Sequence, residues 1–448
     1  MEENTPAWLK RTVMTAGLLL AIPGLILAIN LLCIVPLVLL NGPETDAILY
    51  GIASLAITLL TLGAGGAAFW HARHALDKKP SKALRLPSPI LLVGGFILLI
   101  ELGIISRMGL EVFFPIILVV CAILPPLWAV AWMTPPAPAR QPVDDAKEEP
   151  ITEENTQRTT HHFMTWRYGL VSFAGGATVS VFIAIVLEIL LPVVILSLVF
   201  NLADIVLESI DSLLRALSNA ELADALTSPG FIYLFVQVAV IAPLAEELAK
   251  PLVTVPLLRN LSRQQTFWIG AMAGAGFAAV ENIIYATSGL SLWAGILIVR
   301  AVGAALHPLG SGLMALGWRG VLRGDTGSVT NWWKCFGIAV ASHAIWNGGS
   351  LLVITLGGAR FFGQLPADID VLGLSMAGTT LAFLIVLGLS ALWIGRAYGH
   401  DKPLFELEQR EPSDSKFIPS DRAAAIWGFA CLAAIVPVGI AGLLVWLR

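Results

Sequence analysis

Long apolar runs follow one another along the whole sequence of 448 residues, and few folds are open to such a chain. A bilayer core about 30 Å thick is crossed by about 20 apolar residues in a helix, which satisfies its own backbone hydrogen bonds. The composition agrees, because 57% of the residues are hydrophobic, 13% are charged and the mean hydropathy is +0.81. We therefore predict an all-α, polytopic transmembrane helical bundle of about eleven spans. The spans lie near residues 13–40, 47–70, 88–105, 112–133, 169–200, 231–257, 267–288, 292–317, 335–356, 371–395 and 423–447.

Lysine and arginine gather in every second loop between these runs. The loops after the second, sixth, eighth and tenth spans are basic, whereas the loops between them are poor in both residues. Cytoplasmic loops carry such an excess, so we predict a multi-pass protein of the cell membrane with a cytoplasmic N-terminus. The net charge of −4 and the lack of a basic groove give no indication of a nucleic-acid partner.

One polar segment divides the chain. Residues 134–168 are first rich in proline and then acidic, and they are too polar to bury a core. We predict an accessory four-span bundle over 1–133, a cytoplasmic linker over 134–168 and a catalytic membrane domain over 169–395. A cytoplasmic loop and a C-terminal span would then fill 396–448.

The sixth span carries two acids and a lysine within five residues. A charge at the bilayer centre costs about 2.5–3.5 kcal/mol, so Glu246, Glu247 and Lys250 need an explanation. Their spacing puts Glu246 and Lys250 on one helix face, where they can form an ion pair, and Glu247 nearly on the same face. Pro243 and Pro251 predict a helix that is broken on both sides of the triplet. The alternative is a buried ion pair that only fixes helix packing, which leaves the second carboxylate unexplained.

Each of the next three spans also carries polar groups at a similar depth. The seventh span has Glu281, the eighth has His307 before Pro308, and the ninth has His343 and Asn347 four residues apart. Pro308 disfavours a helical backbone at His307. A single intramembrane histidine or asparagine is often only a hydrogen-bonded core residue or a helix–helix contact. Four consecutive spans with such groups predict one shared polar site instead.

Together these residues resemble the PrsW family of intramembrane proteases, in a superfamily with CAAX prenyl-endopeptidases and bacteriocin-immunity (Abi) proteins. The resemblance covers about residues 165–395 and consists of EExxK at Glu246–Lys250, FxxxEN at Phe277–Asn282, Arg300 with His307, and HxxWN at His343–Asn347. It implies a bacterial endopeptidase that acts, within the lipid bilayer, on a membrane protein or peptide near the end of a transmembrane helix. An anti-sigma factor is one such substrate.

Hydrolysis of a peptide bond needs an activated water, a proton donor for the leaving amine and a stabiliser for the oxyanion. The candidate catalytic residues are Glu246, Glu247, Lys250, Glu281, His307, His343 and Asn347. We expect Glu246, oriented by Lys250, to be the general base. We expect Glu247, Glu281 and His307 to hold or polarise the water. His343 and Asn347 would then bind the oxyanion.

A zinc ion held by Glu281, His307 and His343 is an alternative, because zinc takes carboxylate and imidazole ligands. The sequence contains no HExxH helix, and we favour a mechanism without a metal or other cofactor. A proton-coupled transporter is a second function to consider, since acids and broken helices also line translocation paths. Transporters often contain internal repeats, and the first five spans do not repeat the motifs of the later four, which counts against a transporter. A non-catalytic scaffold is the third, although every motif position is filled.

Overall fold

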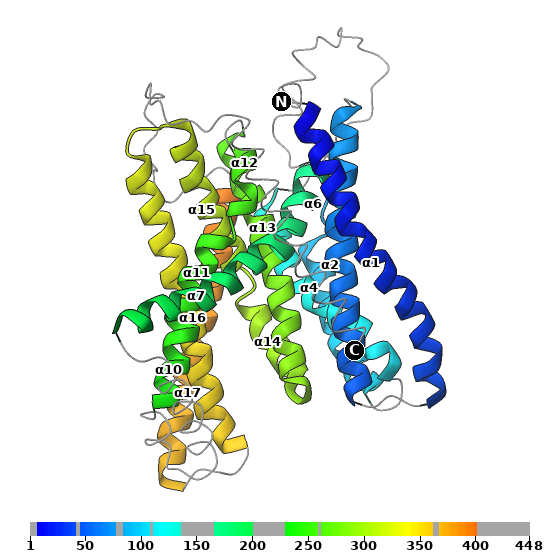
Figure 1. Cartoon of the computed structure of the whole chain (residues 1–448). Helices are drawn as coiled ribbons and strands as arrows, with labels where there is room; N and C mark the ends of the chain where they lie inside the picture. Colours follow the sequence, from blue (N-terminus) through cyan, green and yellow to red (C-terminus); the bar gives the residue numbers. More distant parts are fainter. Residues whose placement is uncertain are drawn as a thin grey trace, which may run out of the picture.

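The computed structural model is built of helices throughout the part of the chain that it describes (Figure 1). The described residues are 7–41, 45–77, 84–107, 111–135, 165–199, 229–258, 261–361 and 367–400. The first helices are α1 (Ala7–Asn41), α2 (Thr45–Leu76), α3 (Pro89–Ser106) and α4 (Phe114–Met133), with the 3₁₀ turn η1 (Glu111–Phe113) before α4.

Two of the following spans are interrupted by π turns. The first consists of α6 (Trp166–Gly175), η2 (Gly176–Ser180) and α7 (Val181–Val199). The second consists of α10 (Pro229–Val236), the π turn η3 (Gln237–Ile241), α11 (Ala242–Ala249), the 3₁₀ turn η4 (Leu252–Thr254) and α12 (Val255–Leu258). After them come α13 (Arg263–Ser288), η5 (Leu290–Leu292), α14 (Trp293–Val302), α15 (Leu306–Arg323), α16 (Ser328–Phe361) and α17 (Ala367–Gly399).

The described helices agree with nine of the first ten predicted spans, all but the eighth. Among the described residues, nine helical segments are long and apolar enough to cross a membrane. A tenth crossing would combine Leu290–Val302 with Leu306–Arg323, which meet at a bend of 42°. The predicted eleventh span, residues 423–447, lies outside the described part of the chain.

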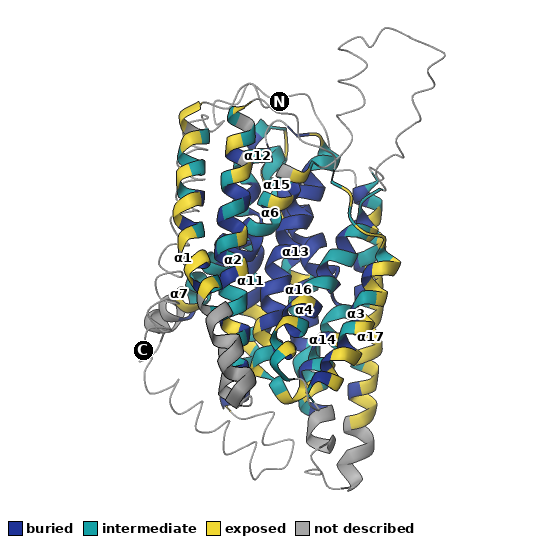
Figure 2. Ribbon diagram, turned by 90° about the vertical axis from the view of Figure 1, so that its right-hand side faces the viewer, coloured by how far each residue is buried: buried dark blue, intermediate teal, exposed yellow. Residues whose placement is uncertain are grey.

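Helix α13 lies at the centre of the bundle, and Figure 2 shows it in the colour of buried residues. It packs against α4, α6 and α15, and 94% of its most apolar stretch is buried. Small residues explain this position. A Cβ atom at Gly276 would overlap the carbonyl oxygen of Phe173 on α6, and one at Gly274 would overlap that of His307 on α15. The backbones of three helices therefore meet directly at α13, as small residues allow in membranes.

Helix α4 shares a hydrophobic core with the helices that follow the polar segment. Ala129, Val130 and Met133 are buried in the same cluster as Phe267 and Trp268 of α13. The predicted division of the chain at 134–168 stays a prediction. Whatever its exact limits, the last helix before that segment packs into the second half of the molecule.

Basic residues gather at one end of the bundle. Arg319 Nε donates to the carbonyl oxygen of Leu261 at 2.9 Å, which brings Arg319 beside the start of α13. Gln264 Nε2 donates to the carbonyl oxygen of Gly399 at 2.8 Å and so fastens the end of α17 to the same place. Arg396 lies one turn before this contact on α17. Three of the loops predicted to be cytoplasmic thus meet at a common end, where α1 also begins (Figure 1).

Candidate active site

The acidic pair is carried by α11, a helix of eight residues that is interrupted on both sides, as predicted. The π turn η3 precedes it, and Pro243 lies in its first turn. Pro251 follows it, and the chain continues into the 3₁₀ turn η4. Ser180 Oγ donates to the carbonyl oxygen of Lys250 at 3.0 Å. A neighbouring helix therefore supplies a hydrogen bond at the C-terminal end of α11, where the helix itself offers none.

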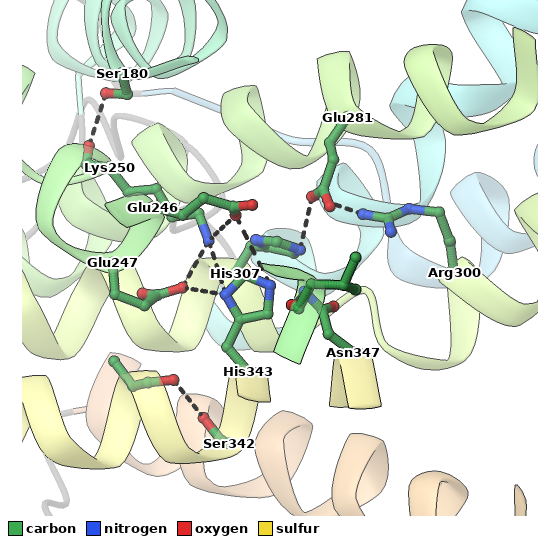
Figure 3. Close-up of polar contacts among 12 residues, drawn as sticks. Ser180, Glu246, Glu247, Lys250, Glu281, Arg300, His307, Ser342, His343 and Asn347 are labelled. Atoms are coloured by element: carbon green, nitrogen blue, oxygen red, sulfur yellow. Dashed lines mark hydrogen bonds and ion pairs between the residues drawn. The ribbon is translucent and has the colours of Figure 1, made fainter. Parts of the chain in front are cut away.

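Lys250 is fully buried and joins both carboxylates (Figure 3). Its Nζ lies 2.9 Å from Glu246 Oε2, which confirms the expected ion pair, and 2.6 Å from Glu247 Oε1, so the second carboxylate is paired as well. The ammonium group also lies 4.6 Å from the centre of the Phe277 ring. Because an isolated buried charge is very unfavourable, these contacts explain how three ionisable groups remain in the core.

His343 and His307 present one free ring nitrogen each. His343 Nδ1 lies 3.0 Å from Glu247 Oε1, and His307 Nε2 lies 3.1 Å from Glu281 Oε2. The opposite nitrogens, Nε2 of His343 and Nδ1 of His307, are buried and have no hydrogen-bond partner among the described residues. The two rings lie 4.8 Å apart in an edge-to-face arrangement (Figure 3). Each carboxylate thus fixes one imidazole and leaves a lone pair for another group.

Arg300 and Asn282 hold Glu281 in place. Arg300 Nη2 lies 2.7 Å from Glu281 Oε2, and Arg300 Nε donates to Asn282 Oδ1. The guanidinium also lies over the Tyr285 ring. The sequence reasoning used Arg300 and Asn282 only as parts of motifs and did not count them among the catalytic candidates. The sequence could have indicated a site role for Arg300, because this residue is a charge inside an apolar run.

Asn347 contacts the backbone beside α11, and the backbone at His307 differs from the expected one. Asn347 Nδ2 donates to the carbonyl oxygen of Val238 in η3 at 3.1 Å, so its amide group holds the backbone beside α11. Its role toward an oxyanion stays a prediction. The expectation of a non-helical backbone at His307 is wrong, because α15 begins at Leu306. Pro308 lies in the first turn, where no N–H group needs a partner, and the break falls just before it.

Glu246, His307 and His343 are suited to hold a metal ion. One ligand atom of each lies within 4.8 Å of those of the other two, and all three side chains are buried. The free nitrogens point to the same conclusion, because metal-binding histidines usually give their second nitrogen to a carboxylate. The zinc set predicted from the sequence has Glu281 in place of Glu246. In the structure Glu281 instead contacts Arg300 and His307 Nε2, the ring nitrogen opposite the free Nδ1.

Comparison with known proteins agrees with this geometry. Residues 164–374 match the model of a family described as PrsW family intramembrane metalloprotease. No curated protein and no solved structure matches the chain. The matched range contains every candidate catalytic residue, and the apolar helices show that the chain can cross a membrane many times. Residues 164–374 are therefore similar to PrsW family intramembrane metalloproteases, and the chain is a protease with several helices that are long and apolar enough to span a membrane.

Proposed function

We propose that the chain hydrolyses peptide bonds of membrane-embedded or membrane-proximal substrates at the site formed by α11, α13, α15 and α16. The observation that carries this proposal is the buried pair of histidines, each with one free nitrogen, beside the carboxylate of Glu246. His343 Nε2 lies 3.8 Å from Glu246 Oε2, so the three groups face a common space. A packing role alone would not leave such groups buried and unpaired.

A metal ion at Glu246, His307 and His343 is part of the proposal. The description of the family as metalloproteases and the free histidine nitrogens both count against our preference for a mechanism without metal. Zinc suits two imidazoles and a carboxylate. A bound ion of this kind supplies an activated water and polarises the carbonyl group of the substrate.

The chain's own residues would orient and balance the site. Glu247 fixes the His343 ring and Glu281 fixes the His307 ring, and the free Nε2 of His343 lies 3.8 Å from Glu246 Oε2. Lys250 compensates the charge of both glutamates on α11. In the mechanism without a metal, Glu246 would instead take a proton from the attacking water and return it to the amine nitrogen when the C–N bond breaks.

The biological setting of this activity is proposed from the resemblance. The substrate would be a membrane protein or peptide in a bacterial cell membrane, with an anti-sigma factor as one example. The superfamily relationship to CAAX prenyl-endopeptidases and Abi proteins belongs to the same proposal. The basic end of the bundle supports a cytoplasmic position for the N-terminus, since α1 begins there.

Cleavage of transmembrane peptides by the purified full chain in detergent tests the site. We expect Glu246→Gln and His343→Ala to lower kcat/KM at least about 100-fold, which is typical for the loss of an acid–base group. His74→Ala is the control, because this histidine lies on α2 and contacts the carbonyl oxygen of Trp70. Full cleavage by both site variants would contradict the proposed site.

Metal content, measured by mass spectrometry, tests the ion separately. We expect about one bound zinc per chain, which is lost in His307→Ala, and cleavage that a strong chelator removes and added zinc restores. Full activity of a metal-free protein would instead favour the mechanism in which Glu246 acts alone. Proton-dependent uptake into proteoliposomes without cleavage would favour a transporter.

A further inference from the structure

A continuous set of contacts leads from His307 out of the protease domain and into α4. Glu281 lies between His307 and Arg300, and Arg300 Nε donates to Asn282 Oδ1. Asn282 Nδ2 then donates to the carbonyl oxygen of Ala122 at 2.9 Å. Ala122 lies on α4, before residue 164, where the match to the family begins. The last partner is thus contributed by the N-terminal part of the chain.

The carbonyl group of Ala122 is available because of a proline. In an α-helix this oxygen would accept the N–H of the residue four positions later, which is Pro126 and has none. Pro125, one position earlier, frees the carbonyl group of Cys121 in the same way. Both prolines lie inside α4 and are buried. Of the two freed oxygens, that of Ala122 is the one that receives a hydrogen bond from Asn282.

The acceptor on α4 decides which way the Asn282 amide faces. An amide group has a donor end and an acceptor end, and Arg300 offers only donors. With Nδ2 bound to the Ala122 oxygen, Oδ1 faces Arg300 Nε. Without that oxygen the amide can rotate and turn its NH₂ group toward the guanidinium. Two donors would then meet, and Arg300 would lose a contact that holds it against Glu281.

We propose that α4 positions residues of the active site. The carbonyl group of Ala122, which Pro126 leaves without a helical partner, orients Asn282. Asn282 in turn positions His307 through Arg300 and Glu281. This inference rests on the role given to His307 in the proposed function. None of the residues between Ala122 and His307 needs to touch the substrate. The N-terminal helices then determine how well the site is ordered, and they are more than a membrane anchor for it.

Pro126→Ala tests the proposal, with Pro125→Ala as its matched control. The first change restores an N–H that competes for the Ala122 oxygen, and the second restores one that bonds to Cys121. Both remove a buried proline from the same turn of α4. We expect Pro126→Ala to lower kcat about tenfold with little change in KM, and Pro125→Ala to stay within about twofold of the wild type. Equal activities of the two variants would overturn the relay.

A double-mutant cycle distinguishes the relay from a general effect on α4. In the Asn282→Ala background the bond to Ala122 is already absent, so Pro126→Ala should cause no further loss. An undiminished loss in that background would reject the proposal. If Pro126→Ala lowers the melting temperature, Asn282→Asp probes the same bond from the other side. It presents an oxygen to Arg300 in either orientation and has no donor for Ala122, so Pro126→Ala should cause no further fall in kcat in the Asn282→Asp background.

The His343→Ala variant separates failure of the relay from failure of the proposed function. Cleavage by His343→Ala would show that the site itself is misassigned and would overturn both proposals. An inactive His343→Ala together with equal Pro125→Ala and Pro126→Ala activities would overturn the relay alone.

Discussion

Lys250 balances the charges of the site through two carboxylates at once. The side chain is fully buried, and it also lies 3.3 Å from His343 Nδ1. Removing one partner of a buried ion pair leaves an uncompensated charge, which costs about 3–5 kcal/mol. Here the loss of the lysine would leave Glu246 and Glu247 facing each other without a cation. The residue therefore contributes both to folding and to the position of the acids.

We expect Lys250→Met to destabilise the protein by about 3–5 kcal/mol and to abolish cleavage. The melting temperature in detergent and the yield of folded protein measure this. Lys334→Met is the control, because Lys334 is exposed on α16. Adding Glu247→Gln to Lys250→Met should recover part of the stability, since it removes one uncompensated charge. A normal melting temperature for Lys250→Met would contradict the burial of this ion pair.

The sequence was sufficient for contacts within one helix but not for those between helices. Glu246, Glu247 and Lys250 could be paired from their spacing alone, because residues three and four apart share a helix face. The bond between Asn282 and Ala122 depends on the axial register of α13 against α4. Periodicity does not determine that register. The partner of His307 was likewise open until α13 and α15 were placed.

At the scale of elements, α13 determines where His307 lies. Its glycines bring α6 and α15 to backbone contact, and Gly274 faces the carbonyl oxygen of His307 itself. A close-packed interior of this kind accepts no additional methyl group without movement. Helix α15 would have to shift, and the imidazole of His307 would shift with it.

We expect Gly274→Ala to lower kcat/KM at least tenfold and the stability by about 1–3 kcal/mol, because the new methyl group overpacks the α13–α15 contact. Cleavage rate and melting temperature are the measurements. Gly337→Ala on α16 is the matched control, since a Cβ atom there has no neighbour within 4 Å. Equal behaviour of the two variants would show that α13 and α15 do not touch at this position.

Helix interruptions could be predicted from prolines only where the position within the helix was also known. Pro243 lies in the first turn of α11, after the π turn η3, and Pro251 follows its end, so both interruptions lie next to the expected prolines. The non-helical backbone predicted at His307 from Pro308 was wrong, because a proline in the first turn of a helix is compatible with helical geometry. The sequence does not show that α15 begins at Leu306 and that Pro308 therefore lies in its first turn.

At the scale of the whole molecule, the N-terminal helices and the protease domain share one core. Met133 of α4 is buried against residues of α13, and Gly395 of α17 faces the Met133 side chain. Trp268 Nε1 donates to the carbonyl oxygen of Gly399 at 3.0 Å in the same region. Helix α4, which precedes the protease domain, and α17, the last described helix, therefore both pack against α13.

We expect a variant that lacks residues 1–133 to be inactive and poorly folded, because it would expose the buried face of α13 that α4 covers. Size-exclusion chromatography in detergent and peptide cleavage measure the result. A chain cut by an engineered protease site between residues 140 and 160 is the control, since it keeps every described helix. We expect that cut chain to stay active. A folded, active protein without residues 1–133 would show that the first four helices are dispensable.

The short helix α11 has a consequence for how the enzyme can be switched. The π turn before α11 and Pro251 after it interrupt the regular hydrogen bonds of this span, so contacts with neighbouring helices help to set the position of α11. Ser180 donates a hydrogen bond to the backbone at the C-terminal end of α11, and Asn347 donates one to the backbone of η3, which precedes α11. A displacement of either neighbouring helix would therefore move α11 and, with it, Glu246 and Glu247. Silencing the protease would then require the displacement of a single small segment, while the remaining bundle stays intact.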